Sequence, residues 1–482
     1  MLTIDDFPDD VLLTMFDFYV VRSARQYVID VGLFDHHDTR REIESWQSLV
    51  HVCRRWRGLV FESPRRLKLQ LCCTPRTPAR ETLDVWPTLP LSIQGDVYET
   101  SVDNVIAVLE HSDRICQIEL NFHATLQIEK LWTAMQVPFP MLESLYLSFG
   151  LRVRGVSFVP ALPDSFLGGS APRLHFLSLA AIPFPVLPSL LLSATHLVDL
   201  YLLYIPHSGY FSPEAMVTYL TIMANLQILH LRFESPQSGP DQENQRSLPS
   251  TRSILPALTE FLFEGVNEYL EDLVARIDTT QLYQFSAIFF NDIDFDTPEL
   301  IRFVSRSSTL NALNRAYVSF DSRTALFKLQ SQASDVDFFQ VKISCRATDW
   351  QLSSLAQICI SSLPLLSKTE KLHIHERLSS QLDWKDGIEN TEWLELLLPF
   401  TAVKDLYLSK QFTPRIAPAL HELTGGRTTE VLPTLQNIFL EGLQPSEPVH
   451  EGIGQFISAR QLSNRPVAVS VWERDSTQEE FY

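Results

Sequence analysis

An α/β solenoid of parallel strands, preceded by a small all-α module, is the fold that this sequence of 482 residues predicts. Three observations lead to it. Hexamers with one apolar pattern recur along most of the chain, several segments between them have helical periodicity, and two short amphipathic helices come before the first hexamer. Because 45% of the residues are hydrophobic and only 20% are charged, the chain has ample apolar surface for a core.

The first predicted helix follows Pro8 near the N-terminus. Its two leading residues are Asp9 and Asp10, which the helix dipole favours in a first turn. One face carries Val11, Leu12, Met15, Phe16 and Tyr19. The spacing of these residues predicts an amphipathic helix.

The second predicted helix covers residues 46–60. Its apolar face carries Trp46, Leu49, Val52, Cys53, Trp56 and Leu59, and Arg54, Arg55 and Arg57 fall on the other side. Two such helices bury too little surface to be stable alone. We therefore expect them to pack on another domain, on a partner, or on both.

The repeated hexamers predict the strands. Their sequences are LESLYL at 142, LHFLSL at 174, LVDLYL at 197, LQILHL at 226, LTEFLF at 258, TEKLHI at 369, VKDLYL at 403 and LQNIFL at 435. Directly successive copies are 23 to 34 residues apart. Strands at this interval are typical of a solenoid in which they stack into a parallel sheet, and eight copies in one register argue against an ordinary α/β domain with Leu-rich strands. Between residues 280 and 345 the repeat pattern does not define where the strands begin.

Two segments between hexamers carry signals for a helix start. In SPEAMVTYLTIMA, Ser212 is in position to cap the helix and Pro213 to begin it. In TPELIRFVSRS, Thr297 and Pro298 occupy the same places. We expect these segments to pack as helices against the sheet.

The strand spacing resembles that of leucine-rich repeats, in an irregular form with long convex segments. The resemblance covers about residues 67–475, followed by an acidic tail at 476–482. It implies a horseshoe with parallel strands on its concave side. The Asn that closes many such repeats is largely missing here.

Residues 1–66 resemble the F-box. The matching residues are Phe7 and Pro8, the apolar helix after them, and Val52-Cys53-Arg54-Arg55-Trp56. Phe7 stands where the family has Leu, and residues 20–45 are longer than the usual link, which leaves the middle helix of the motif unplaced. An F-box followed directly by leucine-rich repeats resembles a large set of fungal proteins.

This resemblance implies a non-catalytic substrate receptor of an SCF-type cullin-RING ubiquitin ligase, acting in ubiquitin-dependent protein degradation. The F-box would dock a Skp-family adaptor and, through it, a cullin, and the repeats would bind an unknown protein target. The residues implied in adaptor docking are Phe7, Pro8, Val11, Leu12, Met15, Phe16, Val52, Cys53, Trp56 and Leu59.

Two other interpretations of the N-terminal region stay open. In one, the helices only cap the exposed end of a repeat scaffold. In the other, Arg54, Arg55, Arg57, Arg65 and Arg66 form a basic patch that binds a polyanion. Patch binding would weaken steeply with added salt, whereas apolar docking would not.

Side-chain alternation predicts a row of residues on the open face of the sheet. The candidates for target binding are Tyr146, Tyr201, His230, Arg232, His373, Tyr407 and Phe439. Aromatic groups on a strand row provide contact area for a protein or peptide. Alternatively, neighbouring rings stack on one another and stabilise the sheet without any ligand.

Charge and composition disfavour several functions. With 39 Lys and Arg against 58 Asp and Glu, the net charge of −19 disfavours nucleic acid and anionic membranes as partners. Residues 176–198 lack charge, but three prolines argue against a membrane span. Six scattered cysteines and no recognisable leader lead us to expect a cytoplasmic or nuclear protein.

No catalytic or cofactor motif is recognisable, so we expect no enzymatic activity, cofactor or metal. His373 and His375 share a strand face but no third ligand can be placed beside them. DIDFDT at 292 has Thr297 where a calcium loop needs Gly.

Overall fold

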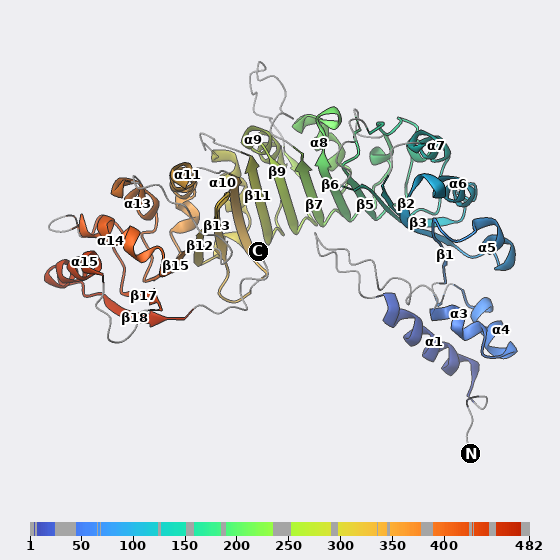
Figure 1. Ribbon diagram of the computed structural model, residues 1–482, viewed down its shortest axis with the longest axis horizontal. Helices are drawn as coiled ribbons and strands as arrows, with labels where there is room; N and C mark the ends of the chain where they lie inside the picture. The colour runs from blue at the N-terminus through green and yellow to red at the C-terminus, as the bar shows by residue number, and fades with distance from the viewer. Residues whose placement is uncertain are drawn as a thin grey trace. The chain divides into compact units, whose positions relative to one another are not determined.

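The computed structural model describes residues 4, 7–24, 45–64, 66–67, 69–123, 127–150, 159–184, 189–234, 252–290, 297–334, 336–344, 348–376, 389–423, 427, 429–442 and 450–473. The chain divides into two compact units. The first comprises residues 1–177 and 188–194, and the second residues 178–187 and 195–482 (Figure 1).

Among its described residues, the first unit begins with the helices α1 (Asp9–Ala24), α3 (Ser45–Val50) and α4 (Arg54–Glu62). The prediction of a single helix over 46–60 was wrong, because the helix is interrupted between α3 and α4. Cys53 has an extended backbone with φ −156° and ψ 172°, and its Sγ accepts a hydrogen bond from the Trp56 N–H at 3.4 Å. Cys53 therefore caps a new helix, and the apolar residues on either side of it do not share one face.

The strands of the first unit are β1 (Leu71–Cys73), β2 (Leu91–Val97), β3 (Ile115–Phe122) and β4 (Ser144–Phe149), paired in parallel in that order. Its remaining helical segments are α5 (Ala79–Val85), η2 (Glu99–Ser101), α6 (Val102–Leu109), α7 (Ile128–Ala134), η3 (Phe166–Gly169) and η4 (Ser189–Leu192). Strand β5 (Phe176–Ala180) contains a boundary between the units.

From β6 onwards, the described residues of the second unit contribute eleven strands to one sheet. Their spatial order is β6 (Asp199–Ile205), β7 (Ile228–Phe233), β9 (Glu260–Gly265), β11 (Gln284–Phe290), β14 (Phe338–Ser344), β13 (Thr324–Gln330), β12 (Arg315–Phe320), β15 (Lys371–Glu376), β16 (Asp405–Leu408), β17 (Asn437–Glu441) and β18 (Ala468–Trp472). All eight predicted hexamers are confirmed as strands, and each strand begins at the third residue of its hexamer.

One strand of this sheet departs from the predicted parallel arrangement. Strand β13 runs antiparallel to β12 and to β14, whereas the other paired neighbours run parallel. The cause is the short turn between β12 and β13. The Asp321 carboxylate accepts hydrogen bonds from the N–H groups of Arg323 and Thr324 at 2.7 and 2.8 Å. A parallel connection needs a much longer crossover, so this turn forces a hairpin where the sequence pattern was blurred.

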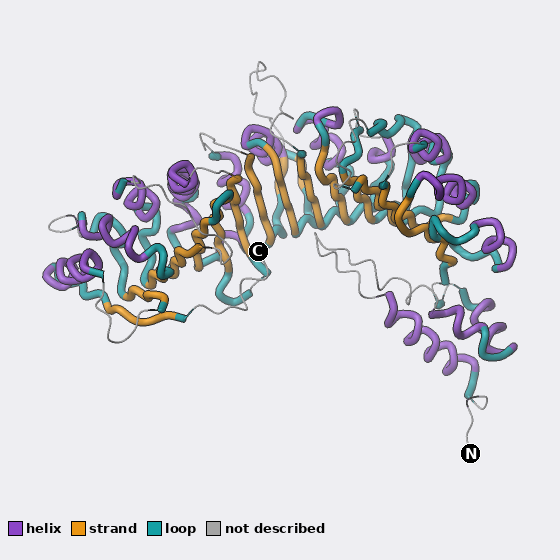
Figure 2. The backbone as a smooth tube through the Cα atoms, in the orientation of Figure 1, coloured by secondary structure: helices purple, strands orange, loops and turns teal. Residues whose placement is uncertain are grey.

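The helical segments of the second unit are η5 (His207–Gly209), α8 (Pro213–Leu220), α9 (Asn267–Arg276), α10 (Pro298–Arg306), η7 (Leu310–Ala312), α11 (Thr348–Ser361), α12 (Leu363–Leu366), α13 (Asn390–Leu397), α14 (Thr413–His421) and α15 (Glu451–Leu462). A short parallel pair, β8 (Ser253–Ile254) with β10 (Ile277–Asp278), lies apart from the main sheet. In each unit the helices cover one face of the strands (Figure 2). The opposite face carries the predicted row of side chains.

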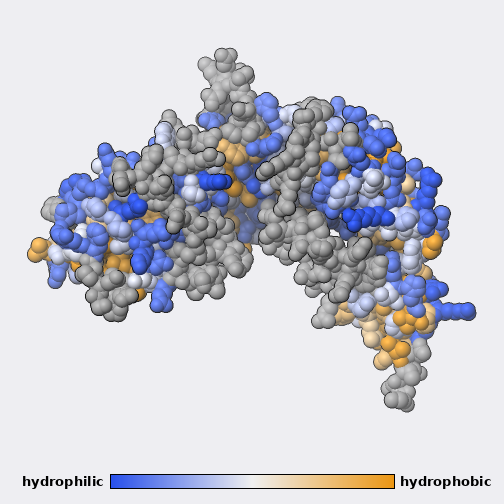
Figure 3. Space-filling view, viewed as in Figure 1, coloured by the Kyte–Doolittle hydropathy of each residue, from blue (hydrophilic) through white to orange (hydrophobic). Residues whose placement is uncertain are grey.

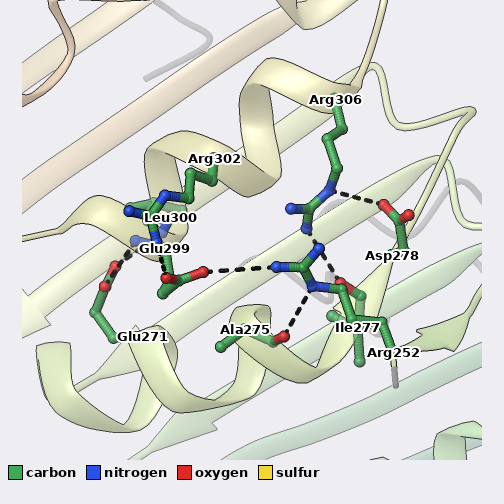
Figure 4. A network of polar contacts seen from close by, with 9 residues as sticks. All are labelled: Arg252, Glu271, Ala275, Ile277, Asp278, Glu299, Leu300, Arg302 and Arg306. Carbon is green, nitrogen blue, oxygen red and sulfur yellow. Dashed lines mark hydrogen bonds and ion pairs between the residues drawn. The ribbon is translucent and has the colours of Figure 1, made fainter. Parts of the chain in front are cut away.

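Helix α8 starts as predicted, because Ser212 Oγ accepts a hydrogen bond from the Ala215 N–H at 3.2 Å. Helix α10 begins at Pro298, but the side chain of Thr297 makes no capping bond. The cap comes from the preceding helix instead (Figure 4). The carboxylate of Glu271, on α9, accepts hydrogen bonds from the backbone N–H groups of Glu299 and Leu300 at 3.0 and 2.9 Å. A buried acid thus joins successive repeats.

The other end of α10 is tied to the same repeat. Arg306 Nε donates to Asp278 Oδ1 at 2.8 Å, and Arg252 Nε donates to the Ala275 carbonyl at 3.0 Å. Arg252 Nη2 also lies 3.9 Å from Glu299 Oε2, so charged side chains contact α10 near both of its ends (Figure 4). Successive repeats are therefore joined by polar contacts as well as by the sheet.

Candidate interaction surfaces

The three N-terminal helices form a small core. Leu12 and Phe16 from α1 and Val60 from α4 are fully or almost fully buried. The ring of Phe16 lies 4.7 Å from that of Trp56. Two of the predicted docking residues, Leu12 and Phe16, therefore lie inside this module and can contribute to docking only by holding its helices in place.

One side of the module packs on the first repeat. The indole of Trp46 lies 5.3 Å from that of Trp86, which follows α5, and Trp86 lies 6.5 Å from Phe61 on α4. Trp46 Nε1 also donates to the carbonyl of Gln70 at 3.0 Å. These contacts cover part of the end of the repeat array, as a cap would.

The outward side of α1 is apolar as well. Val11, Met15, Phe18 and Tyr19 follow one another at helical spacing, and Met15 is 47% exposed and Phe18 is 76% exposed. Val52, between α3 and α4, is 58% exposed. Hydrophobic side chains gather at the surface of this module in Figure 3. We call Val11, Met15, Phe18 and Tyr19 the outer stripe.

The other predicted docking residues are partly accessible. Phe7, Pro8 and Val52 are exposed, and Cys53, Trp56 and Leu59 are half-buried. The prediction omitted Phe18, although its place seven residues after Val11 puts it on the same helix side.

The arginines of the predicted basic patch mostly serve the module itself. Arg55 Nη2 donates to Asp9 Oδ1 at 2.7 Å and to the Phe7 carbonyl at 2.6 Å. Arg57 Nε donates to the Val50 carbonyl at 3.0 Å, and Arg66 Nη2 donates to Thr14 Oγ1 at 3.0 Å. Arg54 is exposed, and Arg65 lies outside the described residues. These bonds join the helices, which reduces the donors that the arginines can offer to a polyanion.

Two predicted target-binding residues are buried in the second unit. Tyr201 is 6% exposed and His230 is 2% exposed, with their rings 4.6 Å apart. His230 Nε2 lies 2.6 Å from Glu260 Oε1. Burial, together with the carboxylates of Asp199 and Glu260, raises the pKa of Tyr201 well above its usual value. This pair forms a buried polar cluster and offers little contact area.

Arg232 is also engaged within the sheet. Its Nε lies 2.5 Å from Glu264 Oε2 on the next strand, and its guanidinium stacks over the ring of Tyr204 at 4.7 Å. In the first unit, Tyr146 is half-buried on β4 and lies in register with Glu119 on β3. Arg232 thus forms a polar contact within the second unit, and Tyr146 lies across from a carboxylate residue in the first.

The other predicted residues form a stack of rings. His373 on β15 lies 4.1 Å from Tyr407 on β16, and Tyr407 lies 4.4 Å from Phe439 on β17, with interplanar angles of 7° in both pairs. Tyr317 on β12 stacks on His373 at 4.7 Å. We call Tyr317, His373, Tyr407 and Phe439 the aromatic ladder. Neighbouring rings stack here as the alternative interpretation predicted.

Tyr317 was not among the predicted target-binding residues, because it lies where the repeat phase was blurred. The antiparallel return through β13 and β14 places β12 directly beside β15, so that Tyr317 is in register with His373. Its sequence context, RAYVSF, has strand alternation, which was the one available signal.

Two basic residues lie beside the ladder. Arg315 on β12 and Lys371 on β15 are register partners. Each lies two residues before a ring of the ladder, Tyr317 and His373 respectively. Burial lowers the pKa of His373 well below its usual value, and the nearby His375, Arg315 and Lys371 add to this effect. His373 is therefore a neutral ring within the stack at pH 7.

The described residues offer no metal centre. Across these ranges, no group of three or more His, Cys, Asp or Glu side chains lies together in a way that could hold a metal ion. Burial raises the pKa of the Cys72 thiol to about 12 and that of the Cys116 thiol to about 11, which disfavours a reactive thiolate at either place. Within the described part of the chain, no helix is both long and apolar enough to cross a membrane.

Several solved structures match this chain, and one of them is a repeat protein. No family model matches the chain, and no curated protein matches it. That structure is the leucine-rich repeat-containing protein LegL7 from Legionella pneumophila, at 12% sequence identity and a TM-score of 0.27. The alignment covers 82% of this chain and 98% of LegL7.

Proposed function

We propose that the chain is a non-catalytic substrate receptor of an SCF-type ubiquitin ligase. The N-terminal module would dock a Skp-family adaptor, and the open face of the repeat sheet would bind a protein target. The proposal places the protein in the cytoplasm or nucleus. It requires neither enzymatic activity nor a cofactor.

The observation that carries the proposal is the outer stripe on α1. A terminal cap needs a polar outer face to keep a repeat protein soluble. Here the module is apolar on two sides, since Trp46 and Phe61 pack towards the repeats while Met15 and Phe18 are exposed. An exposed apolar set of this kind marks a surface for association.

A second candidate function is a repeat scaffold in which the N-terminal helices serve only as a cap. The packing of Trp46 on Trp86 favours it, because this contact covers the end of the repeats. Capping does not account for the exposure of Met15, Phe18 and Val52. The two functions differ in whether α1 has a binding partner.

Co-purification of the full chain with a Skp-family adaptor tests the proposal. Met15→Ser combined with Phe18→Ser removes two exposed apolar groups while leaving the buried Phe16 and Trp56 contact in place. Loss of central apolar anchors costs about 2 kcal/mol each at protein interfaces, so we expect adaptor affinity to fall more than tenfold.

Val85→Ser is the matched control. Val85, on α5, is 75% exposed, almost the same as Phe18, but lies outside the helical module. Retained binding in this variant would assign the effect to α1. A folded wild-type chain that does not bind the adaptor would contradict the receptor role and leave the capped scaffold.

A further inference from the structure

We propose that the sheet face formed by β12, β15, β16, β17 and β18 binds an extended, acidic protein segment that also carries aromatic or aliphatic side chains. The inference names the partner chemistry of the target-binding half of the proposed function, and it rests on that function. Three features of this face carry it: two neighbouring cations that form no ion pair among the described residues, a ring stack beside them, and the dimensions of the row.

The cation pair is the first feature. Arg315 and Lys371 lie opposite each other on neighbouring parallel strands, with their side chains on the same face. Like charges in this relation repel each other and destabilise a sheet. Among the described residues, neither side chain forms an ion pair. A bound anion would relieve the repulsion.

The Nε of Arg315 also lacks a hydrogen-bond acceptor among the described residues. Its Nη1 donates to Tyr317 Oη at 3.3 Å, while its Nε is buried with no acceptor in the described structure. Guanidinium groups present five N–H donors and bind carboxylates through paired hydrogen bonds. The other N–H groups of this guanidinium can donate hydrogen bonds to a carboxylate from outside the chain.

One carboxylate of the protein next to Lys371 has a hydrogen-bond partner on its other side. Asp405 lies opposite Lys371 on β16, but its Oδ1 accepts a hydrogen bond from Asn437 Nδ2 at 2.8 Å on the far side. Arg315 and Lys371 thus lie on β12 and β15 at one end of the row, and Asp405 lies on the next strand, β16. A partner carboxylate fits at the basic end.

The aromatic ladder is the second feature. Its four rings are only half-buried, and they lie directly after the cation pair along the strands. Trp472 on β18 packs edge-on against His373 and Tyr407, at 5.9 and 5.6 Å, and forms a wall beside the stack. Aromatic or aliphatic side chains of a partner would bury apolar area against these rings.

The dimensions of the row point to an extended segment. Five neighbouring strands at about 4.8 Å spacing span about 19 Å, which matches about six residues of extended chain at about 3.3 Å each. The net charge of −19 repels an acidic segment at long range. Selectivity for acid must therefore come from Arg315 and Lys371, which makes these two residues the decisive test.

Fluorescence anisotropy with a labelled probe peptide and the full chain provides that test. The probe has two adjacent glutamates followed by alternating tyrosine and valine. One comparison peptide carries lysines in place of the glutamates, and another carries serines in place of the tyrosines. We expect the probe to bind at least tenfold more tightly than either comparison peptide, and Arg315→Gln with Lys371→Gln to weaken it about tenfold.

The control for charge is Arg302→Gln with Arg427→Gln, which removes two cations from α10 and from the segment after α14. It should leave binding unchanged. Tyr407→Phe keeps the ring and should bind normally, whereas Tyr407→Leu should bind weakly. Thermal unfolding of each variant shows whether weak binding comes from a changed surface on a folded protein or from loss of the folded structure.

Equal binding of all three peptides, an unchanged affinity in the Arg315 and Lys371 variant, or no binding of the probe would each overturn the inference. Measuring adaptor binding with the same protein preparation identifies which half of the proposed function fails. An adaptor complex without peptide binding contradicts the ladder surface alone, and peptide binding without an adaptor contradicts the ligase role alone.

Discussion

The imidazole of His373 lies flat against the ring of Tyr407, with centroids 4.1 Å apart and planes 7° from parallel. The contact belongs to a four-ring stack across strands that are far apart in the sequence, since Tyr317 and Phe439 extend it on either side. Cross-strand ring pairs of this kind stabilise sheets. The stack therefore contributes to stability whether or not a partner binds it.

His373 makes the stability of the second unit depend on pH. Its folded pKa is lowered by burial and by His375, Arg315 and Lys371, while the unfolded value is about 6.5. The unfolded chain thus binds the proton first, and the free energy of unfolding falls as pH drops below about 6.5, by up to about 1.4 kcal/mol per pH unit.

His373→Phe keeps the ring and removes the titration. Urea unfolding at pH 7.5 and pH 5.5 measures the difference between the two proteins. We expect the wild type to lose more stability than the variant over this interval. Equal losses would show that other groups cause the acid sensitivity.

Glu271 should contribute strongly to stability through the cap on α10. Glu271→Ala leaves the N–H groups of Glu299 and Leu300 without their acceptor in a buried place, which costs about 2 to 3 kcal/mol. Glu271→Gln retains one amide oxygen and should cost less. Chemical unfolding of the three proteins tests this order, and an alanine variant as stable as wild type would contradict the capping role.

Helix α15 contains a matched pair of glycines. A Cβ at Gly452 would lie 2.6 Å from the Ala417 carbonyl oxygen on α14, whereas a Cβ at Gly454 would meet nothing within 4 Å. Gly452→Ala should therefore destabilise the protein by about 1 to 3 kcal/mol through overpacking. Gly454→Ala should stabilise it by about 0.5 to 1 kcal/mol through helix propensity. Opposite shifts in melting temperature are expected, and shifts of the same sign would contradict the close approach.

The contact between Trp46 and Trp86 should couple the helical module to the first repeat. Their indoles meet edge to face at 5.3 Å. A double-mutant cycle with Trp46→Ala and Trp86→Ala should give a coupling energy of about 0.5 to 1.5 kcal/mol in unfolding. Additive effects would mean that the module and the repeats are stabilised independently.

The local pattern of the sequence was sufficient for most strands. Most hexamers alternate core-facing apolar residues with residues for the other face, so that Leu145 and Leu147 point to the core and Tyr146 to the other face. The start of α8 was also predictable, because Ser212 caps it from an adjacent position in the chain. Such signals are local and can be recognised without knowing the fold.

The features that the sequence did not reveal depend on residues that are distant along the chain. Glu271 caps a helix 28 residues away, and Tyr317 joins the ladder because β12 pairs with β15 after the chain has turned back. The break at Cys53 is local, but an apolar helical pattern continues through it and conceals it.

The sequence by itself therefore determined the repeat, the strands of the eight hexamers and an apolar face on the first helix. Tertiary structure alone decided which of those apolar residues are exposed, so that Leu12 and Phe16 are buried while Met15 and Phe18 are accessible. It also decided that Tyr201 and His230 are enclosed and that Arg315 and Lys371 are adjacent. The physical reason is that periodicity specifies the face on which a side chain lies, whereas accessibility and charge pairing depend on the neighbours that the fold brings to that face.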